Sequence, residues 1–133
     1  MASIFTKIIE GYIPCYKIAE TELFFAFLDI NPLAKGHTLV IPKKEVDYIF
    51  DLDDDTYKGL MEFSKKVSKA IEASIECSRI GIAVIGLEVA HAHVHLVPIN
   101  NVQDLNFSRP KLALEQDELK SIADTISSAF DKL

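Results

Sequence analysis

The chain has 133 residues, 49% of them apolar, a size that suits one domain with its own core and not two. Its net charge of −6 and pI near 5.1 argue against nucleic-acid binding, which relies on clustered Lys and Arg. Two cysteines without metal-binding spacing, no secretion-type segment and no bilayer-length apolar run predict a cytoplasmic protein without a membrane span.

The first third of the chain predicts a short helix followed by three strands. A helical turn is expected over residues 3–10, ended by Gly11. Apolar runs between turn residues then predict strands at residues 16–19, 23–28 and 37–41. These are expected to be consecutive strands of an antiparallel meander.

The rest of the chain predicts two longer helices and two further strands. Asp53 can cap a helix that reaches about residue 76, because free backbone amides gather where a helix begins. Strands are expected at 80–85 and 89–99, and apolar spacing predicts a final helix over about 115–131. This order, α-β-β-β-α-β-β-α, indicates an α+β fold with a mostly antiparallel sheet, as a single domain over residues 1–133.

Three of the four histidines stand at alternate positions, in the run His91-Ala92-His93-Val94-His95. Successive side chains of a strand point to opposite faces, so the three imidazoles are predicted to share one face, with Ala92 and Val94 on the core face. A structural histidine usually stands alone. The cluster is therefore a candidate chemical site.

Two chemistries suit such a cluster. Two imidazoles at alternate strand positions can chelate zinc in a hydrolytic site, but Glu88 is the one carboxylate close in sequence, and an ion reached by all three rings needs a bent strand. Alternatively, a neutral imidazole attacks phosphorus and forms a phospho-histidine, while its neighbours donate hydrogen bonds to the phosphoryl oxygens.

Further motifs precede the triad in a fixed order. They are Ile4-Phe5-x-Lys7-Ile8-Ile9-x-Gly11-x-Ile13-Pro14, then Asp29-Ile30-Asn31-Pro32, then Lys35-Gly36-His37-Thr38-Leu39-Val40-Ile41-Pro42-Lys43. With the triad, this pattern resembles the histidine triad family of nucleotide hydrolases and transferases, up to about Ile99. The resemblance favours the phospho-histidine interpretation. It also implies a small α+β unit that pairs into a homodimer with a continuous sheet.

The resemblance assigns a role to each histidine. His93 matches the nucleophile that attacks the α-phosphate of a nucleotide and is then freed by water. By the same match, His95 contacts the phosphate, His91 helps to hold the imidazole array, and His37 lies beside them from the neighbouring strand. From the residues alone, His37 is equally well explained as a solvated position after Gly36.

The resemblance also implies a nucleoside pocket. Asp29 matches the acid that accepts hydrogen bonds from the ribose hydroxyls. The residues that match the apolar cleft for the base are Phe5, Ile8, Ile13, Phe27 and Ile30. From residue types alone, Asp29 is an ordinary turn carboxylate before Asn31 and Pro32, and the five apolar residues are ordinary core.

One segment departs from the family pattern. Family members commonly carry Gly-Gln-Ser/Thr-Val before the triad, where this chain has Gly86-Leu87-Glu88-Val89. Leu87 cannot donate a hydrogen bond to a phosphoryl oxygen, and an ionised Glu88 would repel one. We hypothesise that Glu88 recognises a cationic leaving group, such as the amine of a phosphoramidate, or acts in proton transfer.

A second departure concerns zinc. Many bacterial relatives bind a structural zinc through a Cys-x-x-Cys pair, the first triad histidine and a histidine after the Ile-Pro-Lys motif. Ser3, Thr6 and Glu45 hold three of those positions here, so we predict neither this zinc site nor any other cofactor.

The predicted activity is hydrolysis or transfer of nucleoside monophosphate groups through a nucleotidyl-His93 intermediate. The resemblance implies nucleoside phosphoramidates, acyl adenylates or dinucleoside polyphosphates as substrates, with purine nucleotides preferred. Two alternatives stay open: a purine-nucleotide-binding regulatory module with little turnover, and a zinc hydrolase.

Overall fold

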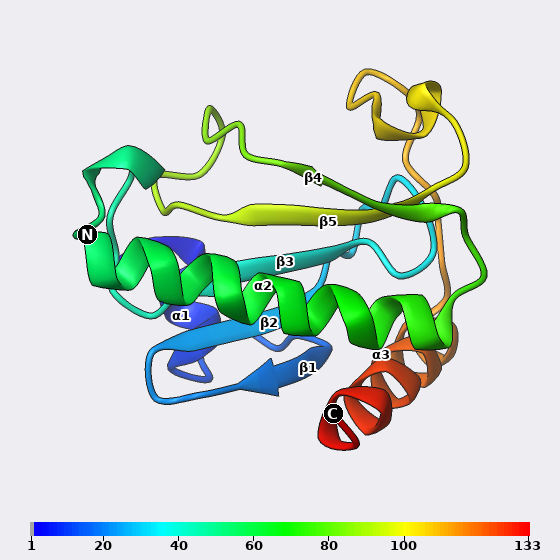
Figure 1. The fold of residues 1–133 in the computed structure, drawn as a ribbon, viewed down its shortest axis with the longest axis horizontal. Helices are drawn as coiled ribbons and strands as arrows, with labels where there is room; N and C mark the ends of the chain where they lie inside the picture. Colours follow the sequence, from blue (N-terminus) through cyan, green and yellow to red (C-terminus); the bar gives the residue numbers. More distant parts are fainter. Residues whose placement is uncertain (1) are drawn as a thin grey trace.

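A five-stranded antiparallel sheet forms the centre of the computed structural model, which describes residues 2–133. Its strands are β1 (Lys17–Glu20), β2 (Phe24–Leu28), β3 (Thr38–Pro42), β4 (Arg79–Ala83) and β5 (Val94–Ile99). They lie in the order β1-β2-β3-β5-β4, which makes β1 and β4 the two edges (Figure 1).

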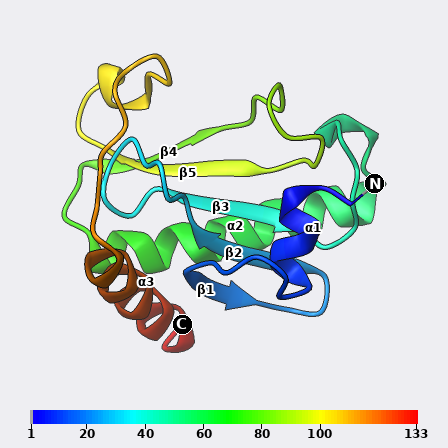
Figure 2. The ribbon, with the colours of Figure 1, turned by 180° about the vertical axis from the view of Figure 1, so that it is seen from behind.

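Helices cover both faces of the sheet. The long helix α2 (Asp54–Ser74) crosses one face, with α3 (Gln116–Asp131) packed against α2 and β1 (Figure 1). The short helix α1 (Ile4–Ile9) lies on the opposite face (Figure 2). Two 3₁₀ turns, η1 (Ile49–Asp51) and η2 (Val102–Leu105), lie in connections. Within residues 2–133, no helix is both long enough and apolar enough to span a bilayer.

The strands β2 and β3 separate two apolar cores because alternate side chains point to opposite faces. Ala26, Leu28 and Val40 face α2, whereas Phe27 and Leu39 belong to a smaller core under α1. On α2 apolar residues at helical spacing form a buried stripe, and each such side chain stabilises the fold by about 1.5–3 kcal/mol. That stripe contains Leu60, Phe63, Val67 and Ile71.

The predicted order of helices and strands is confirmed, and most element ends lie within one or two residues of their predicted positions. The Asp53 side chain accepts a hydrogen bond from the Thr56 amide, which is the predicted N-cap of α2.

The predicted strand over residues 89–99 was too long, because β5 begins only at Val94. The His91 amide donates to the Val89 carbonyl at 2.8 Å and the Ala92 amide to the Val46 carbonyl at 2.7 Å, so this backbone bonds outside the sheet. The ladder between β3 and β5 accordingly starts at Val40 and Val94. His91 and His93 therefore precede the strand, and only His95 lies within it.

Candidate active site

A pocket of about 450 Å³ opens on the α1 side of the sheet. This volume suits a small-molecule ligand. All five residues predicted for the apolar cleft line it, namely Phe5, Ile8, Ile13, Phe27 and Ile30. Its polar lining includes Asp29, Glu88, His93 and His95, whereas His37 and His91 lie behind it. The structure thus gathers the predicted residues around one cavity.

Side chains alternate through the triad even where the backbone is not a strand. Ala92, Val94 and Leu96 belong to the core under α2. The three histidines point to the other face, each at most 8% exposed. The prediction that one face of this segment carries the imidazoles and the other the core is confirmed.

The hydrogen bonds of His93 fix its tautomer. Its Nδ1 lies 2.8 Å from the His91 carbonyl oxygen, which can only accept, so Nδ1 carries the proton. In the neutral ring the lone pair is then on Nε2. Within residues 2–133 every buried side-chain nitrogen or oxygen has a hydrogen-bond partner. Nε2 of His93 has no such partner, so this atom is not buried and is open to solvent. His93 therefore presents the unprotonated nitrogen that a nucleophile requires.

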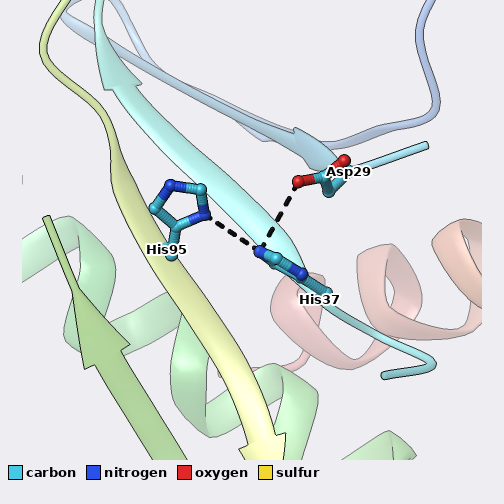
Figure 3. Close-up of side chains that lie close together, drawn as sticks. All are labelled: Asp29, His37 and His95. Carbon is cyan, nitrogen blue, oxygen red and sulfur yellow. Dashed lines mark hydrogen bonds and ion pairs between the residues drawn. The ribbon is translucent and has the colours of Figure 1, made fainter. Parts of the chain in front are cut away.

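His37 and His95 form a relay of hydrogen bonds behind the pocket (Figure 3). The Leu33 amide donates to Nδ1 of His37 at 3.0 Å, which places the proton of a neutral His37 on Nε2. That Nε2 lies 3.0 Å from Nδ1 of His95 and donates to it. His95 consequently carries its own proton on Nε2, the nitrogen left free for a ligand. The relay turns His95 into a hydrogen-bond donor.

Burial keeps both relay rings neutral. Desolvation lowers the pKa of His37 to about 3 and that of His95 to about 4, with a smaller contribution from neighbouring positive charge. At neutral pH the donor presented by His95 is therefore an uncharged N–H. The ring of His95 also lies beside His93, with 4.9 Å between the ring centroids.

Asp29, His37 and His95 also form a possible cation-binding group, since one ligand atom of each lies within 4.8 Å of the others. The hydrogen bonds of His37 oppose this use. A metal on Nε2 would require the proton on Nδ1, where it would meet the Leu33 N–H. The donor set fits a proton relay better than a zinc hydrolase centre.

Asp29 stands at the end of β2 with its two oxygens in different surroundings. One oxygen accepts the Asn31 amide at 2.8 Å, the turn contact expected of an ordinary Asp in this position. The other lies 3.6 Å from Nε2 of His37 (Figure 3). Burial raises the pKa of the carboxyl group, and the nearby Glu88 adds to this effect. Because Asp29 also lines the pocket, its carboxylate has acceptor capacity left for a ligand.

Most of the chain matches the model of a known protein family. The HIT domain family model matches residues 10–102, a range that contains Asp29, His37 and the triad. This chain belongs to the HIT family.

The similarity of this HIT protein to several relatives extends over nearly the whole chain. The adenosine 5'-monophosphoramidase of Schizosaccharomyces pombe is 38% identical over 130 residues, which is 96% of this chain and 98% of the relative. A hypothetical histidine triad nucleotide-binding protein from Sulfolobus tokodaii has a TM-score of 0.84 at 28% identity, over 98% of this chain and 93% of the other. A Zn-bound histidine triad family protein from Mycobacterium smegmatis has a TM-score of 0.83 at 29% identity, over 99% and 95%.

The structure adds one residue to the site of this HIT protein that the sequence did not indicate. Phe107, in the loop after η2, lines the pocket and packs edge-on against His95, with 4.7 Å between ring centroids. It also approaches His37 at 6.1 Å. Its ring covers the relay on the side of the C-terminal segment. No spacing or motif marks it, because the contact depends on how a loop folds back.

Proposed function

We propose that this HIT protein is a nucleotide hydrolase that works through a nucleotidyl-His93 intermediate. The observation that carries the proposal is the pair of open Nε2 atoms, a lone pair on His93 beside a donor N–H on His95. A phosphorus atom attacked by the first has an oxygen within reach of the second. The charge that develops on this oxygen is then stabilised by a donor already in place.

The reaction proceeds in two displacements. His93 Nε2 forms a bond to phosphorus while the bond between phosphorus and the leaving group breaks, and the leaving group takes up a proton from solvent. Water then attacks the same phosphorus and gives a proton back to solvent, the nitrogen–phosphorus bond breaks, and the nucleoside monophosphate is released with His93 restored. Neither step needs a redox cofactor.

The nucleoside is the part of the substrate that the pocket binds. Its apolar lining offers surface to a base, and Asp29 at its edge can accept hydrogen bonds from two ribose hydroxyls. The name of the Schizosaccharomyces pombe relative supports adenosine phosphoramidates as substrates. We infer a purine preference on the same basis.

Incubation with a fluorogenic adenosine phosphoramidate tests this function. The protein is expected to release AMP and the free amine over many turnovers, and a titration of binding by AMP should report on the same pocket. Tight binding without product release would favour the alternative, a nucleotide-binding regulatory module. Full activity after treatment with a chelator is expected, because no step passes through a metal.

Glu88 is proposed to select the leaving group. It lines the pocket together with Asp29, and the lining contains neither Lys nor Arg. A polyphosphate leaving group would therefore meet two carboxylates without a Lys or Arg side chain in the lining to balance them. An amine that carries a positive charge is attracted instead.

Glu88→Gln is expected to reduce kcat/KM about 10-fold for an adenosine phosphoramidate whose amine bears a second, cationic group. The same change should leave a neutral amine substrate within about two-fold, because only the charge of residue 88 differs. The control variant is Glu62→Gln, measured with the same two substrates. It changes an exposed carboxylate of α2 on the other face of the sheet. An unchanged ranking of the two substrates would remove this role of Glu88.

We also propose that two copies pair through the β4 edge into one continuous sheet. Within residues 2–133 no strand pairs with β4 on its outer side, and the residues of β4 are exposed or half-buried. Apolar side chains gather near that edge, including Ile82, Val84, Ile85 and Leu87. Sedimentation of the purified protein at micromolar concentration should give the mass of a dimer, and a monomer would contradict this pairing.

A further inference from the structure

Four side chains from three segments, one of them the first histidine of the triad, converge at the start of α1. Ser3 and Thr6 lie at the start of α1, Glu45 follows β3, and His91 precedes β5. One oxygen of Glu45 accepts both the Ser3 amide and the Thr6 hydroxyl, each at 2.6 Å. The Ser3 hydroxyl in turn donates to Nδ1 of His91 at 2.8 Å. We call these four residues the clasp.

The clasp is connected to the proposed nucleophile through His91. Nε2 of His91 donates to the Pro42 carbonyl at 2.8 Å, so the ring is held from both sides. The backbone carbonyl of His91 is the acceptor that fixes the His93 tautomer at 2.8 Å. The clasp therefore restrains the residue on which the orientation of His93 depends.

A second connection passes through α1 itself. Phe5 lies between Ser3 and Thr6 on this helix and is 5% exposed. Its ring packs edge-on against His91 and His93, with centroid distances of 5.8 and 5.0 Å. Anchoring both flanking residues to Glu45 thus also fixes the aromatic wall against which the His93 ring rests.

The donor set of the clasp does not fit the structural zinc that the family resemblance implies at these positions in many bacterial relatives. Zinc in such sites is bound by thiolates and imidazoles, whereas Ser3 and Thr6 offer hydroxyls. The lone pair of His91 Nδ1 is already engaged by the Ser3 hydroxyl, and Ser3 Oγ accepts the Thr6 amide at 3.0 Å. With this lone pair engaged and hydroxyls in place of thiolates, the four residues do not form a ligand set for the metal.

We propose that Glu45 is a positioning residue, which through Ser3 and His91 holds His93 in its nucleophilic tautomer without a metal. The inference rests on the proposed function for its catalytic consequence. The carboxylate suits this task because it accepts from several donors at once and stays ionised. The hydrogen bonds from Ser3 and Thr6 lower the pKa of Glu45 to about 2.

The test combines kinetics with imidazole NMR. Glu45→Ala is expected to lower kcat about 10-fold or more, because a misplaced reacting group is costly even when substrate still binds. Nitrogen-15 spectra of the His93 ring should change from the Nδ1–H form to a mixture of tautomers. Asp47→Asn, which changes an exposed carboxylate two residues away, should leave both readouts as in the wild type.

A designed zinc site provides the positive control. In Ser3→Cys/Thr6→Cys/Glu45→His, the new side chains and His91 form a Cys₂His₂ set at the point where the clasp converges. This variant should bind one zinc per chain and return His93 to its Nδ1–H form, and a chelator should reverse the effect. If Glu45→Ala does not fold, Ser3→Ala removes the donor to His91 and replaces it in the same comparison.

Three results would overturn the proposal. They are wild-type kcat and His93 tautomer in Glu45→Ala, the same in Ser3→Ala, and a zinc-loaded triple variant in which His93 remains a mixture of tautomers. The tautomer is read without substrate. If the wild-type protein does not turn over phosphoramidates, the proposed function is contradicted. The NMR spectra of the His93 ring then still test the role of the clasp.

Discussion

His93→Ala is expected to lower kcat for an adenosine phosphoramidate by about 10⁴-fold or more, because the atom that forms the covalent bond to phosphorus is removed. AMP binding should change only a few-fold, since the base cleft and Asp29 are untouched. Initial rates with a fluorogenic phosphoramidate measure the first effect, and a binding titration by calorimetry measures the second.

The variant preserves the surrounding contacts as far as any substitution can. The His91 carbonyl loses a donor, while Ala92 and Val94 remain in the core under α2. A circular dichroism spectrum and melting curve close to those of the wild type exclude unfolding as the cause. Residual activity within about 10-fold of the wild type would show that another group attacks phosphorus.

His37→Phe is expected to produce the second largest loss, about 10² to 10³ in kcat, although His37 does not line the pocket. Without the donor on His37 Nε2, the proton of His95 is no longer held on Nε2. Nδ1 of His95 then faces an apolar ring, so the donor that faces the phosphoryl oxygen is lost in all but a small fraction of the molecules. KM should change little, because the base cleft and the ribose contact stay in place.

The pH profile follows from the lowered pKa values of His37 and His95, about 3 and about 4. Both rings are neutral above about pH 5, so titration of the relay should add no step to log kcat near pH 6.5, the ordinary pKa of a histidine. Below about pH 4, protonation of His95 on Nδ1 places its proton against the donor N–H of His37, and the rate should fall. A rate that already halves near pH 6.5 through titration of His95 would contradict the buried, neutral relay.

The lowered pKa values of His37 and His95 also predict how the free energy of unfolding changes with pH. A histidine whose pKa is lower in the folded protein stabilises it above the unfolded pKa, and this contribution is lost as pH falls toward the folded value. Between pH 7.5 and 5 the loss is about 2 kcal/mol for each such histidine. Urea unfolding at pH 7.5 and pH 5 should therefore show a smaller decrease for His37→Phe than for the wild type.

Short-range patterns in the sequence were sufficient to predict the helices and strands. The cap at Asp53 and the spacing of apolar residues along α3 are local features, and both appear as predicted. The triad shows the limit of such patterns. The alternation of its side chains was predicted correctly, but the start of β5 depends on hydrogen bonds of His91 and Ala92 that no local pattern contains.

Contacts between distant residues account for the parts of the site that the sequence did not reveal. Comparison with the family drew attention to Ser3, Thr6 and Glu45 as replaced zinc ligands, but their mutual hydrogen bonds span about 40 residues and emerge only in the fold. Phe107 carried no signal at all. Its place over His95 is set by the path of the loop that follows η2.

Mass spectrometry of rapidly quenched enzyme tests the covalent step most directly. After mixing with an adenosine phosphoramidate, a peptide that contains residues 91–95 is expected to gain one AMP group, localised by fragmentation to His93. The adduct should appear within a single turnover, decay as AMP is released, and be absent from His93→Ala. An enzyme that turns over rapidly while His93 stays unmodified at every time point, or that carries the nucleotide on another residue, would contradict the account.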